Sequence, residues 1–277
     1  MHQDTEHIIL LMKEAYSADL SIYDDAFIKQ TLISRMLILS LDESKDYLSL
    51  LKTHPDEAEE LIMGLKNSYS EFFRDKTTFS LLEQYLLPGL FKKKKYTKPS
   101  EIRVWSAACA AGQEPYSVAI LLEDYVRTFT PGVSFRIFAT DLNPACLQSA
   151  KEGIYEPETL RNISLAHYQR YFSPCQRRVR IHESVRNTVD FSLHDLTDEN
   201  LRAPTESIYG DFDLIFCANI LFYYQPMVRR KIMETLRQTL IPGGYLITGE
   251  AETSIVADFR ELHPIMPPAP IFQKIEP

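Results

Sequence analysis

Residues 102–120 constrain the fold more than any other part of the chain. They begin with Ile, Val and Trp at 102–105, a composition that favours a buried strand. Residues 107–112 are all small, and Pro115 then opens a helix, since its missing N–H costs nothing in a first helical turn. A loop of small residues between a strand and a helix lets a ligand approach the backbone. In α/β proteins this arrangement is typical of a site for a nucleoside-type cofactor.

From residue 101 onward, expected strands alternate with expected helices, which indicates a mostly parallel sheet with helices on both faces. Strands are expected at 102–108, 134–140, 189–194, 213–218, 244–250 and 270–275, and helices at 115–129, 144–151, 158–171 and 226–240. Short β-like pieces near 173–187 interrupt the alternation and predict a small β insertion. The predicted fold class of residues 101–277 is therefore α/β.

Residues 1–91 show the spacing of amphipathic helices and predict an all-helical N-terminal domain. Its last helix is expected to stop at Pro88 and Gly89, with a lysine-rich linker over 92–100. This part holds 8 of the 30 Lys and Arg but 16 of the 38 Asp and Glu, so it carries the whole net charge of −8. Nucleic-acid binding depends on Lys and Arg, so the charge argues against a nucleic-acid partner.

Composition places the chain among ordinary globular proteins, with 45% hydrophobic and 25% charged residues. No apolar run approaches the ~20 residues that cross a bilayer, and the first residues lack the layout of a secretory signal, so no membrane insertion is expected. Four scattered cysteines without Cys-x-x-Cys spacing predict reduced thiols and a cytoplasmic location. The seven histidines show no metal-ligand spacing, so no metal site is predicted.

Polar residues follow three of the expected strands, at the edge where open α/β sheets place ligands. Asp141 follows the second strand, and its carboxylate can bind both ribose hydroxyls. It can equally cap the helix after Asn143, and the two roles are compatible. Asp195 and Leu196 follow the next strand, where a polar group can meet an adenine edge. Asn219 ends the fourth.

Glu114 indicates the charge of the ligand. Local chemistry favours a structural explanation, in which the carboxylate complements the helix dipole, over a carboxylate that faces a cofactor ammonium. The loop before it lacks Gly-x-Gly-x-x-Gly, however, and Glu114 would repel a pyrophosphate. S-adenosylmethionine carries an ammonium and a sulfonium and no phosphate. The charges therefore favour methyl transfer over redox chemistry.

Taken together, these segments resemble the chemotaxis receptor (protein-glutamate) O-methyltransferases, in one order and over nearly the whole chain. Residues 68–74 resemble that family's Asn-x-Thr-x-Phe-Phe-Arg motif and 105–117 resemble its cofactor loop. Matching pieces follow at 139–141, 153–155, 171–172 and 216–223. The resemblance implies a Rossmann-like S-adenosylmethionine methyltransferase sheet with a small β-subdomain insertion, preceded by an all-α N-terminal domain.

The resemblance also implies site residues. Cofactor binding is predicted for Ser68, Ser70, Arg74, Glu114, Asp141, Asp195, Leu196, Ala218 and Asn219, and catalytic roles for Arg74 and Tyr223. A glutamate side chain (pKa ~4.3) is ionised at neutral pH, so esterifying it needs no general base and depends on positioning. The expected partner is a protein substrate such as the cytoplasmic helix of a chemoreceptor, with S-adenosylhomocysteine as the product.

Several departures from the family's motifs keep other functions open. Ser68 stands where the family has Asn, Ala218 stands where it has Arg, and residues 249–252 read Gly-Glu-Ala-Glu in place of Gly-His-Ser-Glu. The family's helical domain also tends to be basic, whereas this one is acidic. Two alternatives follow: the same cofactor with a different protein substrate, and a non-catalytic signalling adaptor that binds S-adenosylmethionine.

Overall fold

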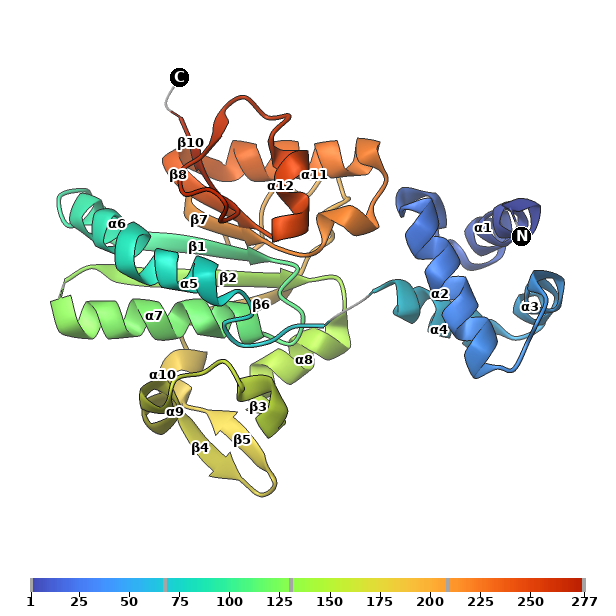
Figure 1. Cartoon of the computed structure of the whole chain (residues 1–277), viewed down its shortest axis with the longest axis horizontal. Coiled ribbons are helices and arrows are strands. Elements are labelled where there is room, and N and C mark those ends of the chain that lie inside the picture. The colour runs from blue at the N-terminus through green and yellow to red at the C-terminus, as the bar shows by residue number, and fades with distance from the viewer. Residues whose placement is uncertain (1, 67–68, 130–131, 208–209, 276–277) are drawn as a thin grey trace. The chain divides into compact units, whose positions relative to one another are not determined.

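The computed structural model describes residues 2–66, 69–129, 132–207 and 210–275 of the chain. The chain divides into two compact units, which Figure 1 shows in ribbon form. The first comprises Met1–Asn67 together with Leu221–Arg230, and the second comprises Ser68–Ile220 and Lys231–Pro277. The first unit is helical, and the second is built around a sheet.

Helices that each bury one apolar side form the first unit. They are α1 (His2–Tyr16), the 3-10 turn η1 (Leu20–Ile22), α2 (Asp25–Ile38), α3 (Ser44–Leu51) and α4 (Pro55–Leu65). The side chain of Asp24 caps α2 by accepting the N–H of Ala26, and Pro55 begins α4. These local signals explain why the predicted helices begin where they do.

An ion pair with little exposure joins α2 to α4. Nη2 of Arg35 lies 2.6 Å from Oε2 of Glu57, and the hydroxyl of Tyr47 donates to Oε1 of Glu57 at 2.7 Å. Tyr47 is fully buried, and Glu57 is 8% exposed. The carboxylate is therefore satisfied from two helices, which fixes α2, α3 and α4 against one another.

Residues 221–230 complete the first unit although they come late in the chain. They include η4 (Leu221–Tyr223) and the start of α11 (Pro226–Thr239). The ring of Tyr224 stacks on Tyr23 with centroids 5.4 Å apart, and the N–H of Gln225 donates to the carbonyl of Ile22 at 2.9 Å. The helical unit is thus not one continuous stretch of sequence.

Among the described residues, a seven-stranded sheet forms the centre of the second unit (Figure 1). Its strands are β1 (Glu101–Ala107), β2 (Ser134–Asp141), β6 (Val189–Leu193), β7 (Phe212–Cys217), β8 (Leu240–Thr248), β9 (Leu262–Pro264) and β10 (Ile271–Lys274). The order is β6-β2-β1-β7-β8-β10-β9, and the first five strands are parallel. This confirms the predicted α/β fold. The order reverses direction between β1 and β7, where open sheets place their ligands.

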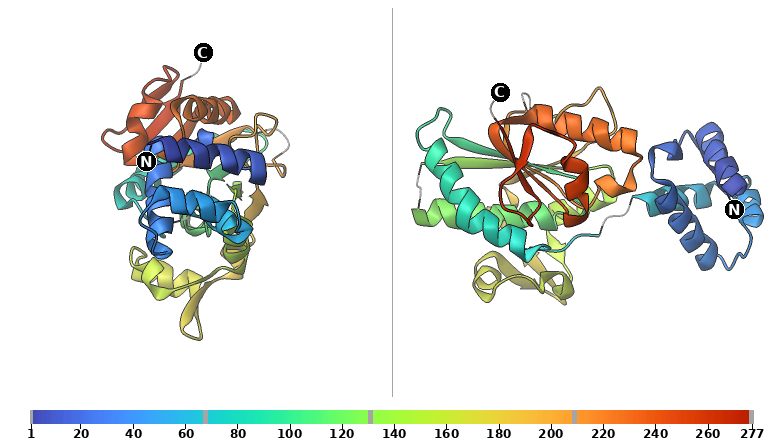
Figure 2. Two further views of the ribbon diagram at one scale, coloured as in Figure 1. Left: turned by 90° about the vertical axis from the view of Figure 1, so that its right-hand side faces the viewer. Right: turned by 45° about the horizontal axis from the view of Figure 1, so that its top comes forward.

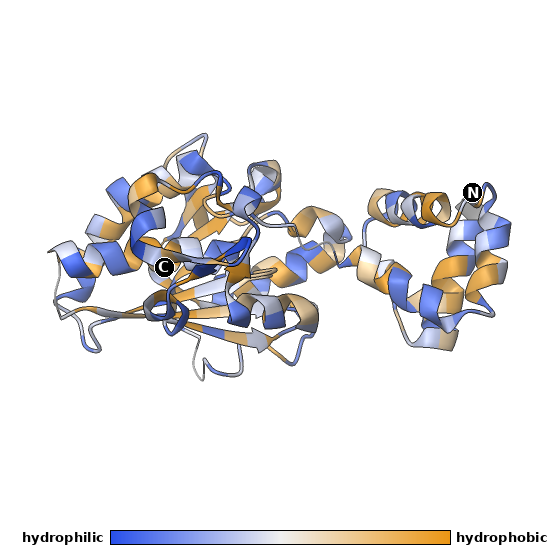
Figure 3. Ribbon diagram, turned by 90° about the horizontal axis from the view of Figure 1, so that it is seen from below, coloured by the Kyte–Doolittle hydropathy of each residue, from blue (hydrophilic) through white to orange (hydrophobic). Residues whose placement is uncertain are grey.

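Helices cover both faces of this sheet, as the two views of Figure 2 show. The larger ones are α7 (Gln113–Phe129), α8 (Pro144–Glu152) and α11, and two short ones, η5 (Glu250–Glu252) and α12 (Thr253–Val256), follow β8. Figure 3 shows mostly apolar strands and helices that carry both polar and apolar sides. Within the described ranges, no helix is both long and apolar enough to cross a membrane.

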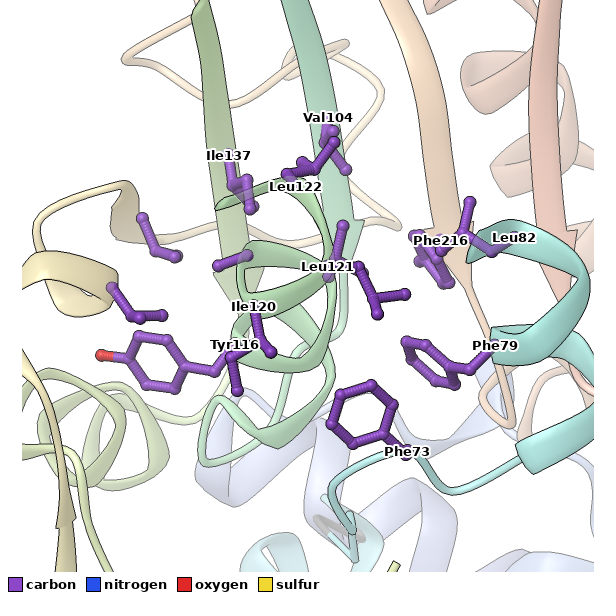
Figure 4. Close-up of a cluster of buried hydrophobic side chains, with 14 of the residues drawn as sticks. Phe73, Phe79, Leu82, Val104, Tyr116, Ile120, Leu121, Leu122, Ile137 and Phe216 are labelled. Carbon is purple, nitrogen blue, oxygen red and sulfur yellow. The ribbon is translucent and has the colours of Figure 1, made fainter. Parts of the chain in front are cut away.

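The two units meet in sequence at residues 67/68, and not near residue 91 as expected. Three successive helical segments, α5 (Lys76–Leu81), η2 (Leu82–Leu86) and α6 (Leu87–Lys94), belong to the second unit. The reason is burial. Figure 4 shows Phe73, Phe79 and Leu82 gathered with Phe216 of the sheet, and the rings of Phe79 and Phe216 stack with centroids 6.0 Å apart.

The start of the expected linker at 92–100 also differs in the structure. α6 runs through Pro88 and Gly89 to Lys94 and follows the π-helical turn η2 without a break, so the missing N–H of Pro88 falls where the helical hydrogen-bond pattern changes. Nζ of Lys94 lies 2.9 Å from Oδ2 of the fully buried Asp213, which also accepts the N–H of Arg103 at 3.0 Å. This part of the lysine run therefore compensates a buried carboxylate of β7.

A three-stranded antiparallel sheet forms the insertion. Its strands are β3 (Ile154–Tyr155), β4 (Phe172–Cys175) and β5 (Arg178–Ile181), in the order β3-β5-β4. Three short helices accompany it, η3 (Pro157–Leu160), α9 (Leu165–Tyr171) and α10 (Glu183–Arg186). The insertion is larger than the expected 173–187, because β3 supplies an edge from residues that precede α9.

Candidate active site

The loop between β1 and α7 turns tightly, and the N–H of Gly112 donates to the carbonyl of Cys109 at 3.0 Å. Ala108, Ala110 and Gly112 all have positive φ, at 65°, 49° and 90°. A Cβ on Gly112 would lie 2.9 Å from the Cβ of Ala150, so only glycine fits there without displacing a neighbour. The hydroxyl of Tyr155 in β3 donates to the carbonyl of Ala111 at 2.8 Å. The insertion thus supports the loop from outside.

Glu114 lies in the first turn of α7, with its side chain partly buried. The Ser106 hydroxyl at the end of β1 donates to Oε1 of Glu114 at 2.7 Å. Burial raises the pKa of Glu114 to about 7, repulsion from Glu252 adds to the rise, and the Ser106 hydrogen bond and the positive charge of Arg74 oppose it. A carboxylate with so high a pKa is poorly compensated, and a cation placed beside it would be stabilised.

Asp141 ends β2 and braces the same loop. Its Oδ2 accepts the N–H of Ala110 and its Oδ1 accepts the N–H of Asn143, both at 2.8 Å. The helix cap itself is Asn143, whose side chain accepts from the N–H of Ala145 at 3.0 Å. The alternative in which Asp141 caps this helix is therefore wrong. Each of its carboxylate oxygens can accept more than one hydrogen bond, so the bonds to Ala110 and Asn143 leave the ribose role possible.

Asp195 and Leu196 follow β6, and both are half-buried. Oδ1 of Asp195 accepts two hydrogen bonds from Thr197, one from the N–H at 2.8 Å and one from the side-chain hydroxyl at 2.7 Å. These two bonds close a tight turn. Just before it, the N–H of His194 donates to the carbonyl of Asp141 at 3.2 Å. The turn after β6 is therefore tied directly to the residue that ends β2.

The segment that contains Ser70 and Arg74 is clamped at three points. The side chain of Glu71, 6% exposed, accepts from Asn162 at 3.2 Å and pairs with Arg161. The ring of Phe72 packs edge-on against Tyr155, with centroids 4.8 Å apart. The N–H of Phe73 donates to the buried Ser117 hydroxyl of α7 at 3.0 Å.

Arg74 follows these contacts and is exposed, with its guanidinium over the Tyr69 ring, 5.4 Å from the centroid. Its positive charge lowers the pKa of Glu114, which places the two side chains within electrostatic reach of each other. Ser70 is half-buried on the same segment. Sequence reasoning named Ser70 and Arg74 but missed Glu71, whose role depends on Arg161 and Asn162 far along the chain.

Ala218 and Asn219 follow β7 directly. Asn219 has a φ of 63°, in the left-handed region that asparagine tolerates better than most residues. Its N–H donates to Oε2 of Glu252 at 2.9 Å, and the N–H of Ile220 donates to Oε1 at 2.7 Å. Glu252 is fully buried and was not predicted as a site residue. The sequence feature that could have identified Glu252 is its position, four residues after the end of β8.

The two remaining predicted residues are Ser68 and Tyr223. Ser68 falls outside the described residues. Tyr223 belongs to the first unit, where its ring packs against Phe27 with centroids 4.3 Å apart and its carbonyl accepts the N–H of Asp24 at 2.8 Å. The other predicted residues all belong to the second unit, at the ends of β1, β2, β6 and β7 and on the segment before α5.

The second unit matches the CheR methyltransferase SAM-binding domain over residues 68–263, and residues 3–65 match the CheR methyltransferase all-alpha domain. The chain belongs to the CheR methyltransferase family. Its cofactor is S-adenosylmethionine. The boundary between the two matches agrees with the division of the structure into two units.

Several chemotaxis protein methyltransferases are similar to this CheR chain over most of their length. That of Escherichia coli K12 is 34% identical over 227 residues, which cover 80% of this chain and 74% of that protein. That of Borreliella burgdorferi is 27% identical over 267 residues, covering 95% and 92%. Chemotaxis protein methyltransferase 1 of Pseudomonas aeruginosa is 34% identical over 200 residues, covering 70% and 69%.

The residues of the second unit suit S-adenosylmethionine on their own chemistry. Positive φ at Ala108, Ala110 and Gly112 turns the loop at 108–112 tightly, and the side chains of Ala150 and Tyr155 pack against Gly112. Glu114 lacks full compensation of its charge, as its raised pKa indicates, and an ammonium would supply it. Within the described part of the chain, no group of three His, Cys, Asp or Glu side chains is arranged to hold a metal ion.

Proposed function

We propose that this CheR methyltransferase esterifies glutamate side chains of a chemoreceptor, or of a related signalling protein, in the cytoplasm. The observation that carries the proposal is Glu114, a carboxylate with a pKa raised to about 7 at the end of a tightly turned loop of small residues. None of the four cysteines of the chain, all of them described in the structure, is joined in a disulfide, which suits a reducing compartment. The chemotaxis methyltransferases to which the chain is similar favour a protein acceptor.

We infer that different predicted residues bind different parts of the cofactor. Glu114 binds the ammonium, Asp141 binds the ribose hydroxyls, and the turn at Asp195 and Leu196 borders the adenine. The rest of the cofactor contacts Asn219, Ala218 and Ser70. When bound, S-adenosylmethionine supplies an electrophilic methyl group on a sulfonium.

Catalysis then depends on placement. The acceptor glutamate is already ionised at neutral pH, so it needs no base. Arg74, exposed on its clamped segment, attracts the acceptor carboxylate and orients it towards the methyl group, and Tyr223 is proposed as the second positioning group. The sulfonium loses its charge as the methyl group leaves it. Strong anionic contacts at sulfur would therefore favour the ground state, which agrees with Glu114 binding the amino end.

Methyl transfer from radiolabelled S-adenosylmethionine to a chemoreceptor cytoplasmic fragment tests this proposal. Wild-type protein should give label that base releases, because methyl esters hydrolyse in alkali and N-methyl groups do not. Glu114→Gln should abolish the transfer, and Glu83→Gln, which changes an exposed carboxylate on η2, should not. Label that survives alkali would contradict the ester.

A second candidate keeps the cofactor and changes the acceptor. The acidic balance of residues 1–91 favours a neutral or basic partner, whereas the expected receptor helix is acidic. Transfer into a cell lysate, followed by the same alkali step, separates the two. Base-stable label on a basic protein would favour this candidate.

A further inference from the structure

Glu252 lies at the point where β7 and β8 end side by side. It is fully buried, and its carboxylate accepts hydrogen bonds from both strand ends. Oε2 accepts the N–H of Gly249 at 2.7 Å and that of Asn219 at 2.9 Å, while Oε1 accepts the N–H of Ile220 at 2.7 Å. Three short backbone bonds to one buried carboxylate suit its ionised form.

This arrangement determines the conformation of Asn219. A left-handed φ of 63° is sparsely populated for a residue other than glycine and persists where the surroundings hold it. Glu252 supplies that hold, because it binds the N–H groups of residues 219 and 220 together. Gly249 completes the contact from the other side, since a Cβ there would lie 2.5 Å from Nδ2 of Asn219. The side chain of Asn219 is thus packed directly on a glycine backbone.

The negative charge of Glu252 also acts on Glu114. Ser106 at the end of β1 pairs in register with Phe216 of β7 and donates to Glu114, so both carboxylates lie where these strands end. The groups that act on Glu114 are Glu252, which raises its pKa, and Ser106 and Arg74, which lower it. The thiols of Cys109 and Cys217 also lie near Glu114, and burial keeps both neutral by raising their pKa.

We propose that Glu252 is a positioning residue for the cofactor site: its buried carboxylate holds Asn219 in the conformation that meets S-adenosylmethionine. This rests on the proposed function, in which Asn219 is a cofactor contact. Glu252 itself touches backbone N–H groups and acts through Asn219. A second consequence concerns charge, since a fixed negative group near Glu114 adds to the attraction for a cationic ligand.

Calorimetric titration with S-adenosylhomocysteine tests this on the full chain. In Glu252→Gln an amide N–H₂ must face a backbone N–H, so affinity should fall by at least about tenfold. Gly249→Ala keeps the carboxylate of Glu252 but places a Cβ 2.5 Å from Nδ2 of Asn219 and 3.0 Å from Oε2 of Glu252, so it displaces the side chain of Asn219. The φ of −79° suits alanine, and affinity should fall by a similar factor. Glu250→Gln changes the exposed neighbour in the same turn and should leave affinity unchanged.

The pH profile of binding provides a readout that a purely structural role would not move. Glu252→Gln removes the repulsion on Glu114, so the midpoint of the profile should shift to lower pH. Gly249→Ala should keep the wild-type midpoint. Wild-type affinity in both variants would overturn the inference. If Glu252→Gln does not fold, wild-type affinity in Gly249→Ala is enough to overturn it, because the placement of Asn219 would then not matter for binding. A wild-type chain that binds no S-adenosylhomocysteine would instead overturn the proposed function.

Discussion

Replacing Glu114 by Gln should stabilise the free protein while it abolishes cofactor binding. The pKa of Glu114 is about 7 in the folded chain against an ordinary value of 4.5. Between these two pH values the folded state binds more protons than the unfolded state, so stability falls as pH rises through that window. At pH 8 the folded chain carries the full cost of an ionised, buried carboxylate.

The magnitude follows from the shift. A difference of about 2.5 pKa units corresponds to about 3 kcal/mol of unfolding free energy at 1.36 kcal/mol per unit. Protonated Glu114 contributes this stability in full below pH 4.5, and the contribution is lost by about pH 8. Glutamine keeps the Ser106 hydrogen bond and cannot ionise. The variant should therefore exceed wild type by up to about 3 kcal/mol at pH 8 and match it near pH 4.5.

Denaturant unfolding at several pH values measures this difference directly, with Glu83→Gln as the exposed control. Adding S-adenosylhomocysteine should reverse the order at pH 8, because only wild type binds it and gains stability by mass action. Wild-type affinity should itself fall about tenfold for each pH unit below 7, as Glu114 becomes protonated. A variant that is less stable than wild type at pH 8, or that binds the ligand normally, would refute this reasoning.

Other positions give further predictions. Asp141→Ala should lower affinity for S-adenosylhomocysteine by at least about tenfold, since it removes the brace on Ala110 and the proposed ribose contact; calorimetry showing wild-type affinity would exclude that role. Tyr155→Phe removes one hydrogen bond to the cofactor loop and should cost about 1 kcal/mol in unfolding free energy and raise KM for the cofactor several-fold. An unchanged KM would show that the loop needs no support from β3. Glu57→Gln should cost about 2 kcal/mol by breaking the pair with Arg35 and leave the cofactor affinity of the folded protein intact, because Glu57 belongs to the first unit and the proposed cofactor contacts to the second; calorimetry showing lost affinity would contradict that assignment.

Much of the fold was predictable because its signals are local. The strands that end at Ala107, Asp141 and Cys217 are apolar runs followed by small or polar residues, and their positions in the structure agree with those expected from the sequence. The cofactor loop was readable for the same reason, since small residues, a glycine and Pro115 lie within a few positions of one another. Glu114 could be interpreted because its charge alone excludes a phosphate.

Features that depend on contacts between distant residues were not predictable. Residues 68–91 have helical spacing like the residues before them, and nothing local indicates that Phe79 packs on Phe216 of the sheet domain. The lysine run resembles a solvated linker, because its partner Asp213 lies more than a hundred positions away. Glu252 was overlooked for the same reason: its function depends on the N–H groups of residues 219 and 220, on another strand end.

The chemistry of the acceptor is the central claim, and peptide mapping by tandem mass spectrometry tests it most directly. A chemoreceptor cytoplasmic fragment would be incubated with S-adenosylmethionine and either the wild-type chain or Glu114→Gln. The proposal predicts methyl groups on glutamate side chains with wild type only, and their loss after alkali. Methylation of lysine or arginine, or an unmodified fragment despite normal binding of S-adenosylhomocysteine, would contradict it.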